Sequence, residues 1–425
     1  MTTLLHLLVN PRNFDRLLGR QTGAFRSFGY NVVTASAPGQ RSKAFANSPT
    51  AHHSLTAVSD DSDILADIRA VSQIRGLLAE VKPDIVHTHD AKMAMALRIL
   101  CKRAEVPIVV NTVYDTAGQG MQTLARRVAK SRLDRAAASH SDAEFVRDSD
   151  GAEALRSLGV PDERIHLIGS GVDLEFFAPN RATARAGRCL RLQLGISLRS
   201  MVVTVVGDLL WDEGYGEFFD AVEILRRRFR VDQVSFVVVG NTRNGPHSID
   251  AETLERMTEE HGVHFIDDGK DESSILAMTD VCVVPTHRPT FPRVAMAASA
   301  MSVPVVATDL PGCRSVIDHQ QTGLLVRPHK PQHLALTIER LLLTASLRSE
   351  LGRAGRARAV VDFDERRVLD RTRRVYEQLL ARNGLPIPEE VIEPDEPWYL
   401  DSIDLVDRES EAERNAEIEL RETGT

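Results

Sequence analysis

The sequence predicts an α/β protein made of two similar halves, each built on a parallel sheet. Short apolar, β-branched runs alternate with helical patterns along most of the 425 residues. Such alternation is typical of parallel sheets whose faces are covered by helices. The alternation pauses once, over residues 178–200, which are rich in Arg and Ala and contain no strand pattern. It then resumes, so we expect a second half of the same kind.

The first half is expected to contain six strands separated by helices. Ile64–Val81 carries apolar residues at a spacing near 3.6, which is typical of an amphipathic helix, and Ala91–Ala104 is similar. Several strand runs are apolar throughout, as expected for strands buried on both faces. The predicted strands are Leu4–Val9, Asn31–Ala35, Asp84–His89, Pro107–Val113, Arg135–His140 and Arg164–Ile168.

The second half repeats this pattern with valine-rich runs. Its predicted strands are Met201–Val206, Ser235–Val239, Val263–Ile266, Val281–Pro285 and Val303–Thr308. Its predicted helices are Tyr215–Arg230, Ala251–His261, Pro292–Met301, Pro331–Val360 and Glu365–Ala381. We therefore expect a first domain over 1–177, a linker over 178–200, a second domain over 201–384 and a tail over 385–425. Ligands of such sheets bind at the carboxyl ends of the strands, which predicts a site in a cleft between the halves.

Composition excludes several classes of protein. With 43% hydrophobic and 26% charged residues, the chain is not disordered as a whole. No apolar run approaches the ~20 residues of a membrane-spanning helix. The four cysteines lie far apart without a CxxC pair, so neither a disulfide framework nor a zinc site is expected. We expect a cytoplasmic protein with no signal peptide and at most peripheral membrane contact.

The net charge of −8 is unevenly distributed. Residues 385–425 hold 14 acidic and 3 basic residues, a local net of −11, which leaves about +3 for residues 1–384. The near-neutral body argues against a nucleic-acid binder. The acidic, proline-containing tail is expected to be largely disordered, with a helix at Glu409–Arg421. It is either a solubilising appendage or a segment that docks a protein partner through Trp398–Leu400.

Several stretches occur in an order that resembles the family-four glycosyltransferases over about residues 1–382. They are Asp84–His89, Gly171–Asp173, Gly207–Gly214, Phe291–Arg293, Val303–Arg314 and Thr322–Val326. The resemblance implies the GT-B architecture, with two Rossmann-like domains and a nucleotide sugar bound mainly by the second. It also implies sugar transfer with retention of configuration, no metal or other cofactor, and a role in polysaccharide or glycolipid biosynthesis.

The loop that should bind the donor diphosphate departs from the family pattern in its charge. The family places an Arg and a Lys there, and this chain has Asp208 and Glu213. One charge pair at ~4 Å is worth about 4 kcal/mol at an effective dielectric of 20. Two reversed pairs therefore predict a loss of diphosphate binding by several orders of magnitude.

Four more family positions have changed. The resemblance calls for two Glu residues that hold the donor sugar and ribose, and Pro289 and Ala297 stand there instead. Neither side chain accepts a hydrogen bond. Thr290 replaces the glycine that usually follows the first Glu, and Tyr114 stands in the stretch where a first-domain His would contact the reacting sugar.

Three alternatives would preserve a site. Side chains around the Phe-Pro turn at a helix N-terminus could supply substitute donor contacts. These are Arg288, Thr290, Phe291 and Arg293. Asp208, Asp212 and Glu213 could instead hold Mg²⁺ that bridges a diphosphate. Alternatively, His287 or Tyr114 could act on a different substrate.

Two histidines and one helix have simpler interpretations. His87 and His89 are two apart on a predicted strand and would share one sheet face, where we expect them to be structural. Arg12–Phe28 mixes basic and aromatic residues and is either a packed helix with a solvated basic side or a surface facing an anionic membrane.

Two functions of different class follow from these residues. One is a glycosyltransferase with lost or altered activity, transferring a sugar from a nucleotide diphosphate sugar to a surface-glycan or glycolipid acceptor. The other is a non-catalytic pseudo-glycosyltransferase that serves as a binding or scaffold partner of an active transferase.

Overall fold

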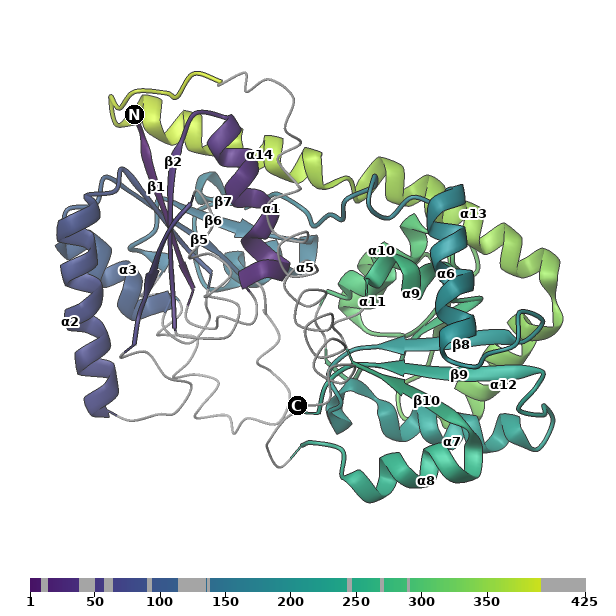
Figure 1. Cartoon of the computed structure of the whole chain (residues 1–425). Helices are drawn as coiled ribbons and strands as arrows, with labels where there is room; N and C mark the ends of the chain where they lie inside the picture. Colours follow the sequence, from purple (N-terminus) through teal and green to yellow (C-terminus); the bar gives the residue numbers. More distant parts are fainter. Residues whose placement is uncertain are drawn as a thin grey trace, which may run out of the picture. The chain divides into compact units, whose positions relative to one another are not determined.

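The chain forms two compact units. The computed structural model describes residues 1–8, 14–37, 50–56, 64–89, 94–113, 135, 138–242, 247–267, 271–288 and 291–390, with the backbone alone for 14–20, 64–68 and 94–96. The first unit is Met1–Ile168 together with the chain from Leu369, and the second is Gly169–Val368 (Figure 1). These boundaries differ from the expected ones, because residues 169–200 group with the second unit and residues 369–384 with the first.

The sheet of the first unit has seven parallel strands in the order β3-β2-β1-β4-β5-β6-β7. Leu5 of the central strand lies opposite Val33 of β2 and Val86 of β4. The strands are β1 Thr3–Leu8, β2 Asn31–Ser36, β3 Ala51–Ser54, β4 Ile85–Thr88, β5 Ile108–Thr112, β6 Ala143–Val146 and β7 Ile165–Leu167.

Five of the six strands predicted for this half are confirmed, with ends shifted by at most one residue. The strand predicted at Arg135–His140 is wrong, because the described residues there are helical or in a turn and the strand follows at Ala143–Val146. The short Ala residues of that stretch suit a helix at least as well as a strand. The edge strand β3 was not predicted.

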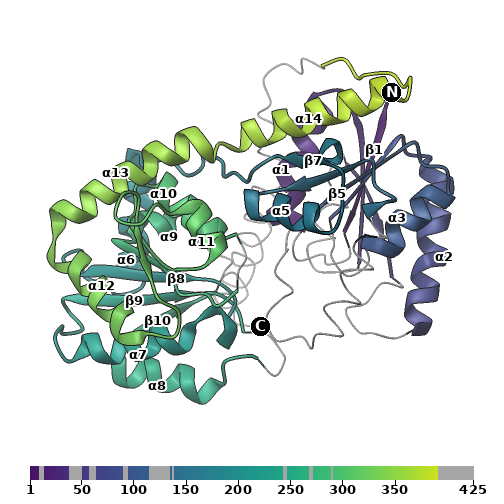
Figure 2. The same ribbon diagram turned by 180° about the vertical axis from the view of Figure 1, so that it is seen from behind.

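Helices cover both faces of the first sheet (Figure 2). They are α1 Phe14–Ser27, α2 Ile64–Val81, α3 Ala94–Arg103, α5 Ser149–Ser157 and the later part of α14 Glu365–Arg382. Because side chains alternate along a strand, Leu5 and Leu7 of β1 pack with residues of α2 and α3. On the other side aromatic rings gather, with Phe25 of α1 and Tyr376 of α14 at 5.2 Å between centroids.

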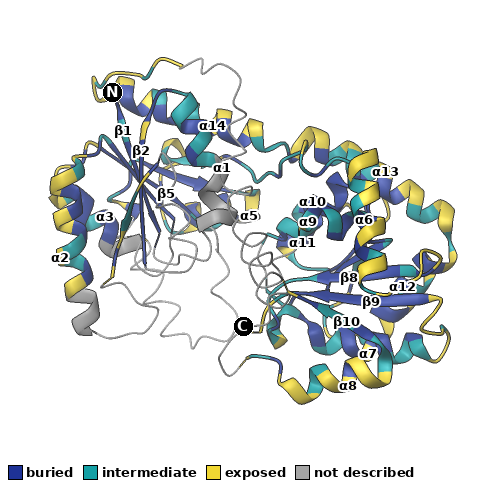
Figure 3. Ribbon diagram, in the orientation of Figure 1, coloured by how far each residue is buried: buried dark blue, intermediate teal, exposed yellow. Residues whose placement is uncertain are grey.

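The sheet of the second unit has six parallel strands in the order β10-β9-β8-β11-β12-β13. The strands are β8 Met201–Val206, β9 Val234–Val239, β10 Val263–Ile266, β11 Val281–Val284, β12 Val305–Thr308 and β13 Leu324–Val326. All five strands predicted for this half are confirmed, and β13 is an addition. The strand interiors are almost wholly buried (Figure 3), which explains their continuous apolar runs.

Two layers of helices enclose this second sheet. The helices are α6 Arg181–Gln193, α7 Tyr215–Arg226, α8 Ala251–His261, α9 Glu272–Met278, α10 Arg293–Ala300, α11 Pro311–Val316, α12 Pro331–Leu343 and α13 Ala345–Asp362, with a short 3-10 turn η4 at Trp211–Glu213. Apolar residues of α7, α8 and α12 share one core cluster. Residues of α6 and α9–α11 contribute to clusters with strand side chains such as Val202 and Cys282, which point the opposite way from Val203 and Val283.

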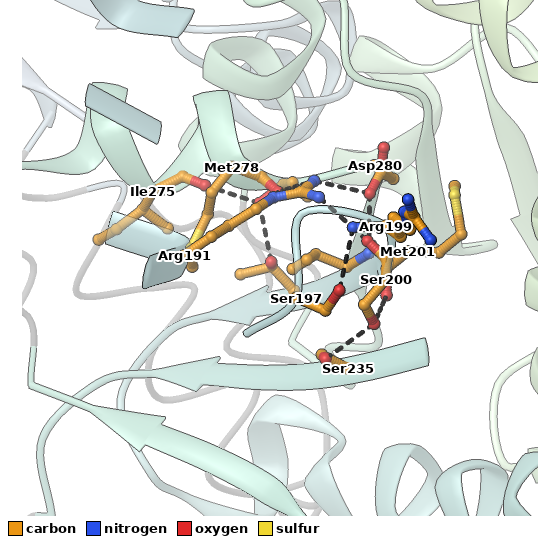
Figure 4. Close-up of polar contacts among 12 residues, drawn as sticks. Arg191, Ser197, Arg199, Ser200, Met201, Ser235, Ile275, Met278 and Asp280 are labelled. Carbon is orange, nitrogen blue, oxygen red and sulfur yellow. Dashed lines mark hydrogen bonds and ion pairs between the residues drawn. The ribbon is translucent and has the colours of Figure 1, made fainter. Parts of the chain in front are cut away.

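The segment predicted as a linker is anchored to the second unit through Arg191 of α6 (Figure 4). The Arg191 guanidinium donates to the carbonyl oxygens of Met278, at 2.9 Å, and Ser200, at 3.0 Å, and it pairs with Asp280 at 2.8 Å. Asp280 in turn accepts the Val202 N–H at 2.8 Å. This helix is therefore part of the second unit's architecture.

The first residues of the expected tail lie against the first unit. The Thr2 hydroxyl donates to the Pro386 carbonyl at 2.6 Å. A β-carbon on Gly29 would stand 2.1 Å from the Glu389 carbonyl oxygen, so the chain passes that glycine closely. Residues 391–425, with Trp398 and the predicted helix at Glu409–Arg421, lie outside the described residues.

Candidate functional site

The candidate site lies at the carboxyl ends of neighbouring strands in the second unit. Loops after parallel strands meet at one edge of a sheet, and β8 pairs with β11. The Gly207–Gly214 turn follows β8, and residues 285–288 follow β11. The two loops touch, because the His287 N–H donates to the Asp212 carbonyl at 3.0 Å.

Glycines shape the backbone of this turn. Gly214 has φ +81°, and a β-carbon there would lie 1.9 Å from the Pro285 carbonyl oxygen. The Tyr215 hydroxyl, at the start of α7, donates to the Gly207 carbonyl at 2.8 Å and closes the turn. Trp211 packs edge-on to Phe219, with 6.5 Å between ring centroids. The loop that the resemblance assigns to the donor diphosphate is thus tightly built.

The acidic residues of the turn are paired with an arginine from the facing loop. Arg288 Nε donates to Asp212 Oδ2 at 2.8 Å, and Arg288 Nη2 lies 2.7 Å from the same oxygen. Arg288 Nη1 lies 3.1 Å from Glu213 Oε1. Asp212 Oδ1 is shielded from solvent and has no hydrogen-bond partner among the described residues. The Arg288 guanidinium is therefore already engaged by two carboxylates.

The carboxyl group of Glu213 is largely buried, and its surroundings change its pKa. Burial raises the pKa of the Glu213 carboxyl, and Asp212 and Asp208 raise it further, while Arg288 and a hydrogen bond from Thr286 lower it. The pKa of Glu213 is therefore raised overall. Burial is the largest cause of this shift, and the charges of Asp212 and Asp208 are its smallest causes.

The second arginine near the Phe-Pro turn is also engaged. Arg293 Nη1 donates to Glu272 Oε2 at 2.7 Å, and the guanidinium lies over the Phe177 ring at 5.5 Å. Phe291 is half-buried and packs against the same apolar cluster. Ala297 of α10 is fully buried in that cluster, so its position presents a methyl group and no hydrogen-bond acceptor.

Three predicted positions cannot be placed. Tyr114, Pro289 and Thr290 lie outside the described residues. Of the other predicted site residues, Asp208 and Glu213 belong to the turn, Arg288 pairs with that turn, and Arg293 begins α10 beside Phe291.

The structure brings together a group that the sequence analysis did not assemble. Glu217 of α7 lies between two histidines, with Oε2 at 2.9 Å from His287 Nε2 and Oε1 at 2.9 Å from His329 Nδ1. The two imidazole centroids are 4.2 Å apart. His287 follows β11 and His329 follows β13, while Glu217 lies in the first turn of α7. Carboxylate and imidazole are ligand types that transition metals accept.

A second histidine group lies in the core of the first unit. His6, His87 and His89 are buried on one sheet face, as expected for the last two, and His6 Nδ1 lies 2.8 Å from His89 Nε2. His87 bonds the hydroxyl of Tyr376 and, at 2.6 Å, that of Thr112. Burial lowers the pKa of His6 to about 3 and the pKa of His87 and His89 well below the usual value. These histidines are neutral and structural.

A cavity of about 390 Å³ lies elsewhere, near the amino ends of the second unit's strands. Thr279 and Asp280 before β11, and Val303 and Pro304 before β12, line it together with residues of α6 and α13. Because ligands of doubly wound sheets bind at the opposite edge, we do not assign the candidate site to this cavity.

Family models match both halves of the chain. The model described as "Glycosyl transferase 4-like domain" matches residues 17–171, and the model described as "Glycosyl transferases group 1" matches residues 200–344. The chain belongs to the family-four-like glycosyltransferases of the GT-B fold. The predicted fold class and family are therefore confirmed.

Curated relatives of this glycosyltransferase-family protein are identical to it at about a quarter of the aligned positions. It is 26% identical over 237 residues to the N,N'-diacetylbacillosaminyl-diphospho-undecaprenol alpha-1,3-N-acetylgalactosaminyltransferase of Campylobacter jejuni, covering 56% of this chain and 60% of that one. It is 27% identical over 317 residues to the D-inositol 3-phosphate glycosyltransferase of Corynebacterium jeikeium, covering 70% and 73%. The chain thus spans about three fifths of the length of the Campylobacter relative.

Solved structures share the fold. A glycosyltransferase from Rickettsia africae superposes with a TM-score of 0.73 at 16% identity, covering 89% of this chain and 98% of that one. HepE from Anabaena in complex with UDP-glucose superposes with a TM-score of 0.73 at 19% identity, covering 90% and 100%. None of the described helices combines the length and apolar character needed to cross a bilayer.

Proposed function

We propose that this glycosyltransferase-family protein does not hold a nucleotide diphosphate sugar in the manner of its family, so that its sugar transfer is lost or altered. The observation that carries the proposal is the engagement of Arg288 by Asp212 and Glu213, at 2.7 and 3.1 Å. The turn that should present two cations presents acids, and the nearby arginine is already paired with them.

The charges at the turn oppose binding of a donor diphosphate. Asp208, Asp212 and Glu213 bring three negative charges to the turn, and Arg288 brings one positive charge. A donor diphosphate carries about −2. A pair of like charges at ~4 Å costs about 1 kcal/mol in water and about 4 kcal/mol at an effective dielectric of 20. A nucleotide diphosphate placed at this turn is therefore repelled.

The proposed class of acceptor substrate is supported by sequence similarity to named relatives. Where transfer persists, we propose that the acceptor is a surface glycan or a glycolipid. The names of the Campylobacter jejuni relative and of an Escherichia coli relative, the UDP-Gal:alpha-D-GlcNAc-diphosphoundecaprenol alpha-1,3-galactosyltransferase, support this class. The E. coli protein is 25% identical over 269 residues.

A second candidate is a non-catalytic binding partner of an active transferase. Ala297 favours it, because this position, which the resemblance assigns to a donor-binding Glu, is fully buried and apolar. The acidic stretch 385–425 would supply a docking segment for such a partner. Co-purification with an active transferase, lost when residues 391–425 are removed, would support this role, and binding of a nucleotide sugar would favour the first candidate.

Calorimetric titration tests the proposal. The wild-type chain should not bind UDP-glucose or GDP-mannose, with or without Mg²⁺, whereas the double variant Asp208→Arg/Glu213→Lys should gain binding. The control Asp232→Arg/Glu255→Lys makes the same charge change at exposed positions away from the turn and should gain none. Micromolar binding by the wild type, abolished by Arg288→Ala or Arg293→Ala, would contradict the proposal.

A further inference from the structure

The group of Glu217, His287 and His329 has the composition and spacing of a metal-binding site. The three side chains each turn one ligand atom toward the others, and all three atoms lie within 4.8 Å of one another. Two atoms bound to one tetrahedral Zn²⁺ at about 2.0–2.1 Å are about 3.3 Å apart. The Oε2–Nε2 and Oε1–Nδ1 distances of 2.9 Å are within a few tenths of an ångström of that separation.

One ligand atom makes no hydrogen bond among the described residues. This atom, His287 Nε2, is also shielded from solvent. Glu217 Oε2 lies 2.9 Å away as an ion-pair partner when the imidazole is protonated. A buried polar atom in this state costs free energy unless a ligand satisfies it. A cation between His287 and Glu217 would accept the lone pair of the imidazole nitrogen and would also pair with the carboxylate.

His329 has a left-handed backbone conformation and the most exposed side chain of the three. His329 has φ +56°, in the left-handed region that glycine occupies at little cost and that other residues rarely adopt. The His329 ring reaches Glu217 from the loop between β13 and α12. The side chain is 69% exposed, whereas those of Glu217 and His287 are 18% and 24% exposed. An ion would therefore enter from the His329 side and keep a coordination position open to solvent.

Two further acidic residues, Asp212 and Asp220, interact with members of this group. Asp212, whose carbonyl holds the His287 N–H, leaves Oδ1 buried and unpartnered among the described residues. One turn beyond Glu217 on α7, burial raises the pKa of Asp220, and Glu223 and Glu217 raise it further. Arg288 offsets part of the Asp212 charge, so Glu217 itself supplies the anionic ligand for a divalent ion.

The histidine group of the first unit serves as a contrast. His6, His87 and His89 also converge, yet they are fully enclosed and no carboxylate belongs to the group. A divalent ion there would place an uncompensated charge in the core. Of the two groups found among the described residues, the second-unit group combines a carboxylate, two imidazoles and access to solvent.

We propose that Glu217, His287 and His329 bind one divalent transition-metal ion, of the class of Zn²⁺, Co²⁺ or Ni²⁺, at the carboxyl edge of the second sheet. Imidazole ligands select this class over Mg²⁺. Three protein ligands with an open position are typical of sites that keep a water or a substrate atom on the ion. The inference does not depend on the proposed loss of donor binding.

Calorimetry and Co²⁺ absorption spectroscopy on the full-length, tag-free chain test the site. We expect one Zn²⁺ per chain and visible Co²⁺ bands typical of low coordination number, with no Mg²⁺ binding. Glu217→Gln keeps the side-chain shape and removes the anion. His329→Gly removes a ligand at a position whose φ suits glycine, so this variant should fold at least as well as the wild type.

Each of these variants should weaken Zn²⁺ binding at least about 100-fold, because loss of groups that only support a ligand already costs 10–100-fold. The control His247→Gln alters an exposed histidine of the same unit outside the group and should bind as the wild type does. Absence of stoichiometric Zn²⁺ binding would overturn the proposal. Binding that survives unchanged in Glu217→Gln and His329→Gly would overturn it as well, since the ion would then lie elsewhere.

Discussion

Arg288 holds the acidic turn together, so its removal should destabilise the second unit. The variant Arg288→Met keeps much of the side-chain length and removes the charge. Its contact with Glu213, at 3.1 Å, corresponds to about 5 kcal/mol of Coulomb energy at an effective dielectric of 20 and about 1.3 kcal/mol in water. Arg288 is 38% exposed and Glu213 24% exposed, so screening and solvation reduce the net effect. We expect a loss of about 1–3 kcal/mol.

Urea unfolding at neutral pH, with the free energies of both variants compared, measures this effect. The matched control is Arg230→Met, whose partner Asp232 lies 3.2 Å away with the two side chains 82% and 65% exposed. That pair should contribute less than about 0.5 kcal/mol. The Glu213 carboxyl should also titrate at higher pH in Arg288→Met. Equal stabilities for Arg288→Met and the wild type would refute the assignment of Arg288 to the turn.

Three further predictions concern the framework. Gly214→Ala should lose at least about 3 kcal/mol of stability, because the φ of Gly214 is +81° and the new β-carbon would lie 1.9 Å from the Pro285 carbonyl oxygen. A near-neutral effect in urea unfolding would be evidence against the tight turn. Glu144→Gln breaks the buried ion pair with Arg98 and should lower the free energy of unfolding by about 3 kcal/mol. Thermal and urea unfolding would measure this loss, and unchanged stability would show that the pair is dispensable. Unfolded His6 binds a proton near pH 6.5 and native His6 only near pH 3, so the free energy of unfolding should fall as pH decreases through this window. In His6→Leu the dependence of this free energy on pH should be shallower by about 1.4 kcal/mol per pH unit. Parallel pH profiles for the variant and the wild type would contradict the neutral state of the buried ring.

The strands and the family could be predicted from the sequence because their signals are local. Valine-rich runs such as Val234–Val239 are buried on both faces and therefore apolar throughout. The segment 178–200 was expected to be a connection because it lacks a strand, yet its Ala and Arg residues favour the helix α6 that the structure contains. The strand predicted at Arg135–His140 failed because small residues carry little periodicity.

The site could be predicted only in part, since its contacts join residues far apart in the chain. The charge change at Asp208 and Glu213 was visible in the sequence, whereas the pairing of Arg288 with Glu213 depends on β8 and β11 being neighbours in the sheet. The group around Glu217 was missed for the same reason. His287 attracted attention by itself, but its partners come from α7 and from the loop after β13.

The position of a bound pyrophosphate tests the central claim most directly. A crystal grown with UDP-glucose and without divalent cations should show no phosphate density beside Asp208 and Glu213. In Asp208→Arg/Glu213→Lys, grown in the same way, the phosphates should occupy the turn between β8 and α7. Well-ordered phosphates at this turn in the wild-type chain, with no intervening cation, would contradict the electrostatic account.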